Sequence, residues 1–205
     1  MRIIAGQLKG RRIASPAWDG LRPTSDRLRE TLFNVLAPRI EGARVLDAFA
    51  GTGALGFEAL SRGAAHVEFV DADPRATAAI ARTAAAWGVE QGYTIHVGDA
   101  VAWLRRLERG PRFDLILLDP PYSLPHVHAV LEAAAGCLAP GGLLVLERAT
   151  RRDVEEPASL ERVRDLRSGD STLTIDRRAG AARTAPAARR SSRPRCSDTP
   201  GTPRE

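Results

Sequence analysis

The stretch Arg44-Val-Leu-Asp-Ala-Phe-Ala-Gly-Thr-Gly-Ala-Leu-Gly56 decides the fold of this chain. Its first six residues are mostly apolar, which predicts a buried strand over 44–49. The glycines at 51, 53 and 56 predict a tight turn into a helix over 55–61, whose first N–H groups can approach a ligand. A strand, a glycine-rich turn and a helix in this order indicate the start of a Rossmann-like α/β unit.

Strands and helices keep alternating after this unit. His66-Val-Glu-Phe-Val-Asp71 has the pattern of a second strand, and Phe113-Asp-Leu-Ile-Leu-Leu118 is apolar enough to be buried on both faces. Further strands are predicted at 93–97, 142–147, 160–166 and 171–175, and further helices at 74–87, 100–107 and 126–138. This alternation predicts an α/β fold with a mostly parallel sheet and helices on both of its faces.

Four aspartates fall at or just after the ends of predicted strands. They are Asp47, Asp71, Asp99 and Asp119. Ligands of such sheets bind outside the carboxyl ends of the strands. Four carboxylates along one sheet edge therefore predict a ligand site at that edge.

The glycine turn has three possible interpretations, of which two are ligand sites and one is a structural turn without a ligand. Gly51, Gly53 and Gly56 match the G-x-G-x-x-G pattern of dinucleotide sites. Asp47 argues against a pyrophosphate, because a carboxylate repels phosphate but pairs with an ammonium group. S-adenosylmethionine carries an α-ammonium and a sulfonium and no phosphate. The structural alternative is a tight turn that only packs the helix on the strand.

The next two aspartates suit other parts of a nucleoside. Asp71 can accept hydrogen bonds from both ribose hydroxyls, a need that NAD and S-adenosylmethionine share. Asp73, before Pro74, is expected to cap the following helix instead. Asp99 can either accept from an adenine amino group or cap the helix that starts at Ala100.

The segment Asp119-Pro-Pro-Tyr122 decides the chemistry. Its two prolines fix the backbone after a buried strand and make a stiff loop. The carboxylate and the loop carbonyls can accept from an exocyclic amine, and the ring of Tyr122 can stack on a base. The alternative is an ordinary strand exit followed by a helix-start proline.

The N-terminal segment lies outside this pattern. Two short apolar runs flank Gly6 to Gly10 and predict a small β-hairpin extension. Thr24 or Ser25 can cap a helix with Leu28, Leu32, Phe33 and Leu36 on one face. We expect a hairpin extension over 1–20, a catalytic domain over 21–178 and a disordered basic tail over 179–205, where Ala, Arg, Pro and Ser prevail.

Positive charge is concentrated at both ends of the 205-residue chain. Residues 1–29 hold seven bases and two acids, residues 30–177 hold 16 bases and 21 acids, and residues 178–205 hold seven arginines and two acids. A basic arm beside an acidic body suits a polyanionic substrate, whereas the alternative is that basic ends are only solvated.

Composition excludes several classes of protein. No run approaches the roughly 18 apolar residues of a spanning helix, and residues 1–12 hold no apolar run of the signal-peptide type. The cysteines Cys137 and Cys196 make neither a disulfide framework nor a zinc site, and Cys137 is expected in the core. The four histidines form no metal set, so we expect no metal, no membrane contact and a cytoplasmic location.

Motifs in both halves of the chain resemble one family. Asp47-x-Phe-x-Gly-x-Gly with a downstream Asp-Pro-Pro-Tyr is similar to class I, S-adenosylmethionine-dependent methyltransferases acting on exocyclic amino groups. Two N-terminal runs, Arg2-Ile-Ile-Ala-Gly-Gln-x-Lys-Gly-Arg-Arg12 and Leu21-Arg-Pro-Thr-Ser-Asp-Arg-Leu-Arg-Glu-Thr-Leu-Phe-Asn34, resemble the RsmD family, the bacterial 16S rRNA guanine-N2 methyltransferases. The resemblance covers residues 1 to about 177.

The resemblance implies a role for each motif. Residues implied to hold S-adenosylmethionine are Asp47, Phe49, Gly51, Gly53, Asp71, Asp99, Ala100 and Thr24. Residues implied to hold the target guanine are Asp119, Pro120, Pro121 and Tyr122. Residues expected to contact rRNA are Arg2, Lys9, Arg11, Arg12, Arg22 and Arg27.

The activity implied by the resemblance is methylation of guanine N2 in 16S rRNA, with the rRNA free, within the 30S subunit or in an assembly intermediate. Direct transfer from a sulfonium needs positioning more than acid–base power, and the guanine has to leave any stack. Two alternatives remain at this point. One is an enzyme acting on adenine N6 in DNA, although no domain for reading a DNA site is evident. The other is a non-catalytic rRNA-binding assembly factor.

Overall fold

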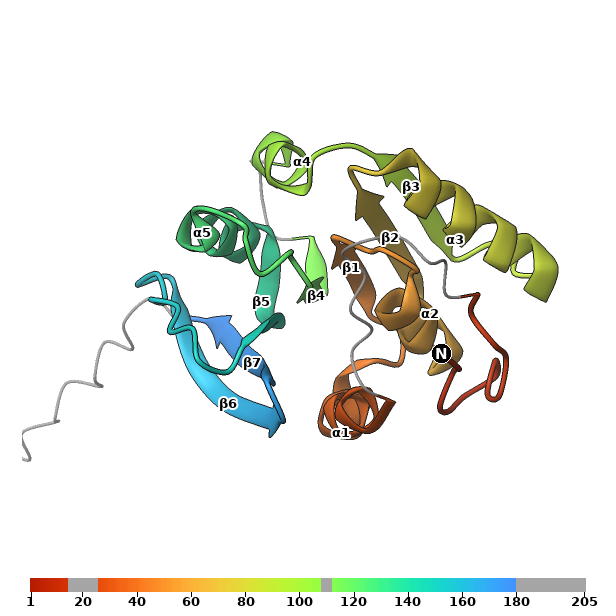
Figure 1. Cartoon of the computed structure of the whole chain (residues 1–205), viewed down its shortest axis with the longest axis horizontal. Coiled ribbons are helices and arrows are strands. Elements are labelled where there is room, and N and C mark those ends of the chain that lie inside the picture. Colours follow the sequence, from red (N-terminus) through yellow and green to blue (C-terminus); the bar gives the residue numbers. More distant parts are fainter. Residues whose placement is uncertain (15–25, 108–111, 180–205) are drawn as a thin grey trace, which may run out of the picture.

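A computed structural model describes residues 1–14, 26–107 and 112–179 of the chain (Figure 1). Seven strands form one sheet in the order β3-β2-β1-β4-β5-β7-β6. The strands are β1 (Arg44–Ala48), β2 (His66–Asp71), β3 (Tyr93–Val97), β4 (Phe113–Leu118), β5 (Leu138–Ala149), β6 (Leu160–Ser168) and β7 (Ser171–Arg178). The helices are α1 (Asp26–Leu36), α2 (Ala54–Ser61), α3 (Pro74–Trp87), α4 (Ala100–Arg106) and α5 (Val127–Cys137), with a 3₁₀ turn η1 (Ala37–Arg39).

Strands β1 to β5 pair in parallel, which confirms the predicted mostly parallel sheet. The β6–β7 hairpin closes the sheet, with β7 antiparallel to β5 and β6 antiparallel to β7. Strand β6 therefore runs in the same direction as β5. The carboxyl ends of β1, β2, β4, β5 and β6 all lie along one edge of the sheet.

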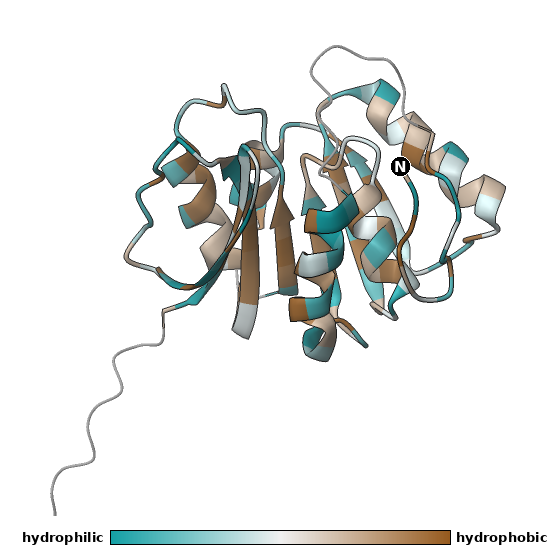
Figure 2. Ribbon diagram, turned by 60° about the horizontal axis from the view of Figure 1, so that its bottom comes forward, coloured by the Kyte–Doolittle hydropathy of each residue, from teal (hydrophilic) through white to brown (hydrophobic). Residues whose placement is uncertain are grey.

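Helices cover both faces of the sheet, as predicted, and each face has its own core. Helices α1, α2 and α3 pack on one face, where Phe33, Phe57 and Ile80 are fully buried. Helices α4 and α5 pack on the other face, around Trp103 and Leu131. The central strands are hydrophobic along most of their length, whereas the helices alternate between hydrophobic and hydrophilic residues (Figure 2). Strand residues that face α1–α3 thus alternate with those that face α4 and α5.

The N-terminal residues form a closed loop that packs on α2. A single antiparallel bridge, Arg2 to Arg12, and the hydrogen bond from Ile3 N to Arg11 O (3.0 Å) close it, so the predicted hairpin lacks two regular strands. The buried Glu58 accepts from the backbone of Ile4 (2.8 Å) and Ala5 (3.1 Å). These bonds occupy N–H groups that a longer hairpin needs for its ladder.

Other differences from the predicted elements occur at their ends. Strand β1 stops at Ala48, because Phe49 has a φ of 64°. Strand β5 begins at Leu138 and runs to Ala149, so it is longer than predicted at both ends. Cys137 is buried in the core, as expected. The tail beyond Ala179 lies outside the described residues. No helix in the described ranges is long and apolar enough to cross a membrane.

Candidate active site

Four acidic side chains meet at the carboxyl edge of the sheet. Core residues under α1–α3 include Val45, Phe69, Leu117 and Val145, and alternation along the chain directs the side chains two residues further on to that same side. The set, which we call the carboxylate edge, consists of Asp47, Asp71, Asp119 and Glu147. Leu118 pairs with Ala48 of β1 and Leu146 of β5, so Asp119 leaves the sheet between the two flanking strands.

The glycine turn wraps around one of these carboxylates. Phe49, Gly51 and Gly53 have φ angles of 64°, 53° and 75°, and a left-handed conformation is costly at the one residue of the three that carries a side chain. The N–H of Gly51 donates to Asp71 Oδ2 at 2.7 Å, which ties the turn after β1 to the end of β2. Three left-handed positions in five residues explain why two of them are glycine.

Asp47 is buried beneath this turn. Its Oδ2 accepts from the N–H of Gly56 at 2.8 Å, and a Cβ on Gly56 would lie 2.2 Å from the ring of Phe69. Burial, opposed by the Gly56 hydrogen bond and reinforced by the charge of Asp71, raises the pKa of Asp47 to about 8. A cation beside this carboxylate would favour its charged form.

The remaining aspartates of the predicted cofactor site have mixed roles. Asp71 is half-buried, and its Oδ1 accepts from the N–H of Asp73 at 2.8 Å. Asp73 caps α3 through the N–H of Arg75, as expected. Asp99 caps α4, with its Oδ1 2.7 Å from the N of Ala102. Of the two roles predicted for Asp99, helix capping is therefore the one that the structure contains. Asp99 is exposed, and capping occupies one of its oxygens.

Asp119 lies in an acidic and largely desolvated position. Burial raises its pKa well above the usual range for aspartate, and the negative charges of Glu147 and Asp47 add to the shift. Glu147 is not among the site residues predicted from the sequence, although it also falls at the end of a predicted strand. The strand end is the one sequence feature that could have indicated Glu147 as a site residue. No glycine or proline motif follows Glu147 to strengthen that indication.

The Asp119-Pro-Pro-Tyr122 loop is held by the first residue of β7 and by an arginine of the loop that follows β5. Pro120 is buried and Pro121 is exposed. The hydroxyl of Tyr122 lies 2.9 Å from Ser171 Oγ at the start of β7. The guanidinium of Arg152 donates to the carbonyl of Tyr122 and, at 3.2 Å, to that of Leu124.

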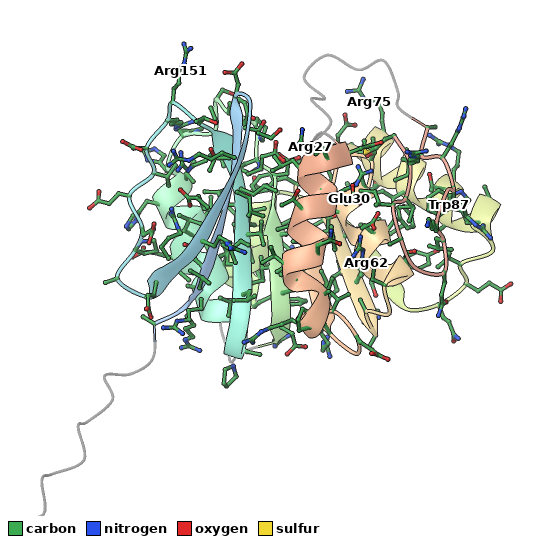
Figure 3. The ribbon with its side chains drawn as sticks, turned by 90° about the horizontal axis from the view of Figure 1, so that it is seen from below. Arg27, Glu30, Arg62, Arg75, Trp87 and Arg151 are labelled. Atoms are coloured by element: carbon green, nitrogen blue, oxygen red, sulfur yellow. The ribbon has the colours of Figure 1, made fainter. Side chains whose placement is uncertain are left out.

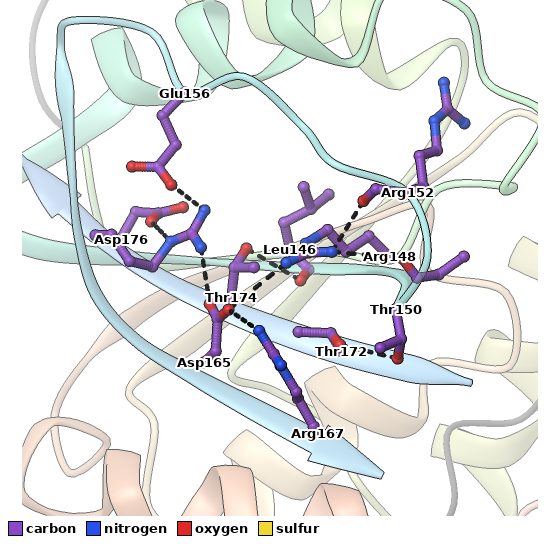
Figure 4. Close-up of polar contacts among 12 residues, drawn as sticks. Leu146, Arg148, Thr150, Arg152, Glu156, Asp165, Arg167, Thr172, Thr174 and Asp176 are labelled. Atoms are coloured by element: carbon purple, nitrogen blue, oxygen red, sulfur yellow. Dashed lines mark hydrogen bonds and ion pairs between the residues drawn. The ribbon is translucent and has the colours of Figure 1, made fainter. Parts of the chain in front are cut away.

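Arg152 contacts Arg148, which belongs to a set of paired charges on β5, β6, β7 and the loop between β5 and β6 (Figure 4). The buried Arg148 donates to the carbonyl of Arg152 at 2.9 Å and lies 3.6 Å from Asp165. We call this set the arginine–carboxylate network. Its members are Arg148, Arg162, Arg167, Glu156, Asp165 and Asp176.

The predicted RNA-contacting bases lie in two separate places. Arg2, Lys9, Arg11 and Arg12 are exposed on the N-terminal loop, whose tip lies beside Ser61, at the far end of α2 from the glycine turn. Arg11 also donates to Trp87 O at 2.6 Å. Arg27 lies in the first turn of α1, at the carboxyl edge, and faces β6 instead. Arg22 and Thr24 lie outside the described residues.

Comparison with known proteins assigns the chain to a family. A family model described as "Conserved hypothetical protein 95" matches residues 1–177. A protein of Haemophilus influenzae, named ribosomal RNA small subunit methyltransferase D, is 34% identical over 173 residues, which are 82% of this chain and 89% of the relative. Its Escherichia coli namesake is 38% identical over 147 residues, 72% of this chain and 71% of the relative. The chain belongs to the RsmD family.

Solved structures agree with this RsmD membership. A structure described as a putative methyltransferase, yhhF, from Escherichia coli has a TM-score of 0.77 at 34% identity and covers 87% of this chain and 97% of its own. A putative methylase from Haemophilus influenzae has a TM-score of 0.72 at 27% identity and covers 86% and 97%. The Rossmann-like methyltransferase fold is thereby confirmed for this RsmD member, which is a methyltransferase by family.

The donor set at the edge fits S-adenosylmethionine better than a dinucleotide. Asp47 and Asp71 place two carboxylates around the glycine turn, where a pyrophosphate would be repelled and an ammonium attracted. Each oxygen of Asp71 accepts one N–H and keeps a second lone pair for a ribose hydroxyl. Among the described residues, no group of three or more His, Cys, Asp or Glu side chains is arranged to hold a metal ion.

Proposed function

We propose that this RsmD-family protein transfers a methyl group from S-adenosylmethionine to the exocyclic N2 of a guanine in 16S rRNA. The observation that carries the proposal is the Asp119-Pro-Pro-Tyr122 loop, clamped beside Asp47 and Asp71 at the carboxyl edge of the sheet. The names of the relatives from Haemophilus influenzae and Escherichia coli support ribosomal RNA of the small subunit as the substrate class.

Residues around the glycine turn hold the methyl donor in this proposal. S-adenosylmethionine supplies an electrophilic methyl group on a sulfonium that departs as a neutral thioether. Asp47 pairs with the α-ammonium, and the turn containing Phe49, Gly51 and Gly53 surrounds the methionine part. Asp71 accepts from the ribose hydroxyls, and Asp99, with the N–H of Ala100, borders the adenine. Thr24 belongs to the same proposed set.

The Asp119-Pro-Pro-Tyr122 loop orients the amine in the proposed reaction. A carboxyl oxygen of Asp119 and a loop carbonyl accept the two N–H groups of guanine N2, which leaves the nitrogen lone pair directed at the methyl group. Tyr122 stacks on the base, and its hydroxyl stays fixed by Ser171. The N2 lone pair forms the new C–N bond, and N2 then releases one proton. The raised pKa of Asp119 favours its acceptance of that proton.

The partner in this proposal is 16S rRNA, free or assembled in the 30S subunit or an intermediate of it. The exposed bases of the N-terminal loop, with Arg22 and Arg27, contribute phosphate contacts. A cytoplasmic location, where ribosomes are assembled, belongs to the same proposal.

The experiment that tests the function is transfer of labelled methyl from S-adenosylmethionine to unmodified 16S rRNA, to 30S particles and to duplex DNA. Digestion to nucleosides identifies the product. N2-methylguanosine from either ribosomal substrate is the expected result. N6-methyladenine in the DNA would replace the proposal with the DNA alternative. Cofactor binding without transfer to any substrate would contradict methyl transfer and favour a binding factor.

A further inference from the structure

An open groove separates α1 from β6, next to the carboxylate edge. It has a volume of about 620 Å³. Its walls come from Arg27, Leu28, Thr31 and Val35 of α1 and from Arg164, Asp165, Leu166, Arg167 and Ser168 of β6. Arg27 and Thr31 are four residues apart and thus share a face of the helix. Arg151 and Arg75 mark the same edge of the molecule as Arg27 (Figure 3).

The groove is cationic once its ion pairs are counted. Asp165 is its only acidic lining residue among those described, and it is paired with Arg148 (3.6 Å), Arg162 (2.8 Å) and Arg167 (3.6 Å). Arg27 and Arg164 are exposed, and within the described ranges neither forms an ion pair. With Asp165 compensated by its own arginines, Arg27 and Arg164 leave a positive surface that is open to solvent.

The groove is connected to the catalytic loop through the β6–β7 turn. Ser168 ends β6 and lines the groove, and three residues later Ser171 contacts the hydroxyl of Tyr122 at 2.9 Å. The carboxylate edge itself carries four acidic side chains, a composition that does not attract phosphates. A polyanionic substrate that inserts one base there therefore needs a cationic path for its backbone beside the site.

We propose that the groove between α1 and β6 binds phosphates of the substrate RNA strand that flank the target guanine. This inference rests on the proposed function and adds a second RNA surface, formed by Arg164 and Arg167 together with Arg27. The N-terminal loop lies on the other side of α1, against α2 and α3. The two basic surfaces thus hold the RNA on both sides of α1.

The test compares two double variants of the full chain. Arg164→Ala with Arg167→Ala removes two charges from the groove. The matched control, Arg105→Ala with Arg106→Ala, removes two exposed charges from the end of α4, on the opposite face of the sheet. Thermal unfolding establishes that both variants fold. Affinity for a 16S rRNA fragment is then measured over a series of salt concentrations.

We expect the groove variant to bind the fragment about tenfold more weakly, with a salt slope about 1.4 smaller in magnitude, because two phosphate contacts on a single strand are lost. Its KM for RNA should rise more than its kcat falls. Arg164→Lys with Arg167→Lys keeps the charges and should restore most of the affinity. The control should bind as the wild type does.

Several results would overturn the inference. One is an unchanged affinity and salt slope in the groove variant. Another is an equal loss in the control, which would indicate overall charge alone. A third is normal binding of naked RNA with a loss confined to 30S particles, which would point to a ribosomal protein in the groove. Absence of methyl transfer by the wild type would instead contradict the proposed function, while the binding assay still tests the groove.

Discussion

The two halves of the sheet differ in whether their buried acidic side chains lie next to other acids or next to arginines. At the ends of β1 and β4, Asp47 and Asp119 are desolvated next to other acids, and their pKa values are raised. At β5, β6 and β7, the arginine–carboxylate network pairs its acids with arginines, as in the 2.6 Å contact of Arg162 with Asp176. The first arrangement costs stability until a ligand arrives, whereas in the second each acid contacts an arginine without any ligand. Acids buried without basic partners are therefore the better indicator of a site.

The strongest test of this contrast is at Asp119. Asp119→Asn should lower kcat for methyl transfer on the order of 10²- to 10³-fold, because the amide turns one acceptor oxygen into a donor and cannot take a proton. S-adenosylmethionine affinity, measured by calorimetry, should change little. A comparable loss of cofactor binding would show that Asp119 serves the cofactor and not the base.

In the network, the expected effect is on stability. Arg162→Ala leaves Asp176 buried without its partner, so the free energy of unfolding should fall by about 2–3 kcal/mol, since Arg162 itself is partly exposed. Denaturant unfolding of the purified protein measures it. Arg177→Ala, which removes an exposed pair with Glu161, is the control and should cost much less stability than Arg162→Ala. Equal losses in both variants would remove the distinction between the network and a surface pair.

Asp47→Asn should separate binding from stability. We expect the Kd for S-adenosylmethionine to rise roughly tenfold or more, because the ion pair with the ammonium is lost. The hydrogen bond from Gly56 remains available to the amide oxygen, so the fold should persist. Tighter cofactor binding by this variant, measured by calorimetry, would exclude the ammonium contact.

The same residue predicts a pH dependence for the ligand-free protein. The pKa of Asp47 is about 8 in the folded chain, whereas an exposed aspartate has a pKa of 3.8. Between these values the folded state holds a proton that the unfolded state lacks, so stability falls as pH rises, by at most about 1.4 kcal/mol per pH unit. Unfolding at several pH values should show this decline in the wild type and a smaller one in Asp47→Asn. Parallel curves would contradict the raised pKa.

The smallest expected effect on activity concerns Arg152, which links the arginine–carboxylate network to the Asp119-Pro-Pro-Tyr122 loop. Arg152→Ala releases the carbonyls of Tyr122 and Leu124, so kcat should fall about tenfold through looser positioning of the base. KM for RNA should change less than kcat. Arg152→Lys should restore part of the rate because it can still donate to one carbonyl. A drop in unfolding temperature that matches the loss of activity would indicate a structural role only.

Most of the fold follows from local sequence patterns, and the exceptions have physical causes. Alternating apolar runs predict the seven strands and five helices to within a few residues. The end of β1 differs because Phe49 has a left-handed φ in a turn that the hydrogen bond between Gly51 and Asp71, twenty residues apart, ties to β2. The N-terminal hairpin is reduced to one bridge because Glu58 takes its backbone N–H groups. Contacts distant in sequence leave no local pattern.

In the candidate site, too, local motifs predict some residues, whereas others are recognised only from contacts between distant parts of the chain. Strand ends followed by glycines or prolines mark Asp47 and the loop after Asp119, since those motifs restrict the backbone locally. Glu147 has no such motif beside it and emerges only when β5 is paired with β4. Likewise Arg27 shares a groove with Arg164 only because the last hairpin returns toward α1.

The docking of the N-terminal loop has a consequence for synthesis of the chain. Its backbone is bound by Glu58, which follows Ile4 by 54 positions, and Gly6 sits so close to Ser61 that a Cβ would lie 1.8 Å from its carbonyl oxygen. A nascent chain grows from its N-terminus. Residues 1–12 therefore leave the ribosome before their docking surface exists, because α2 is made later and has first to form against the sheet. This loop is added to the folded molecule after the segment that follows it in sequence.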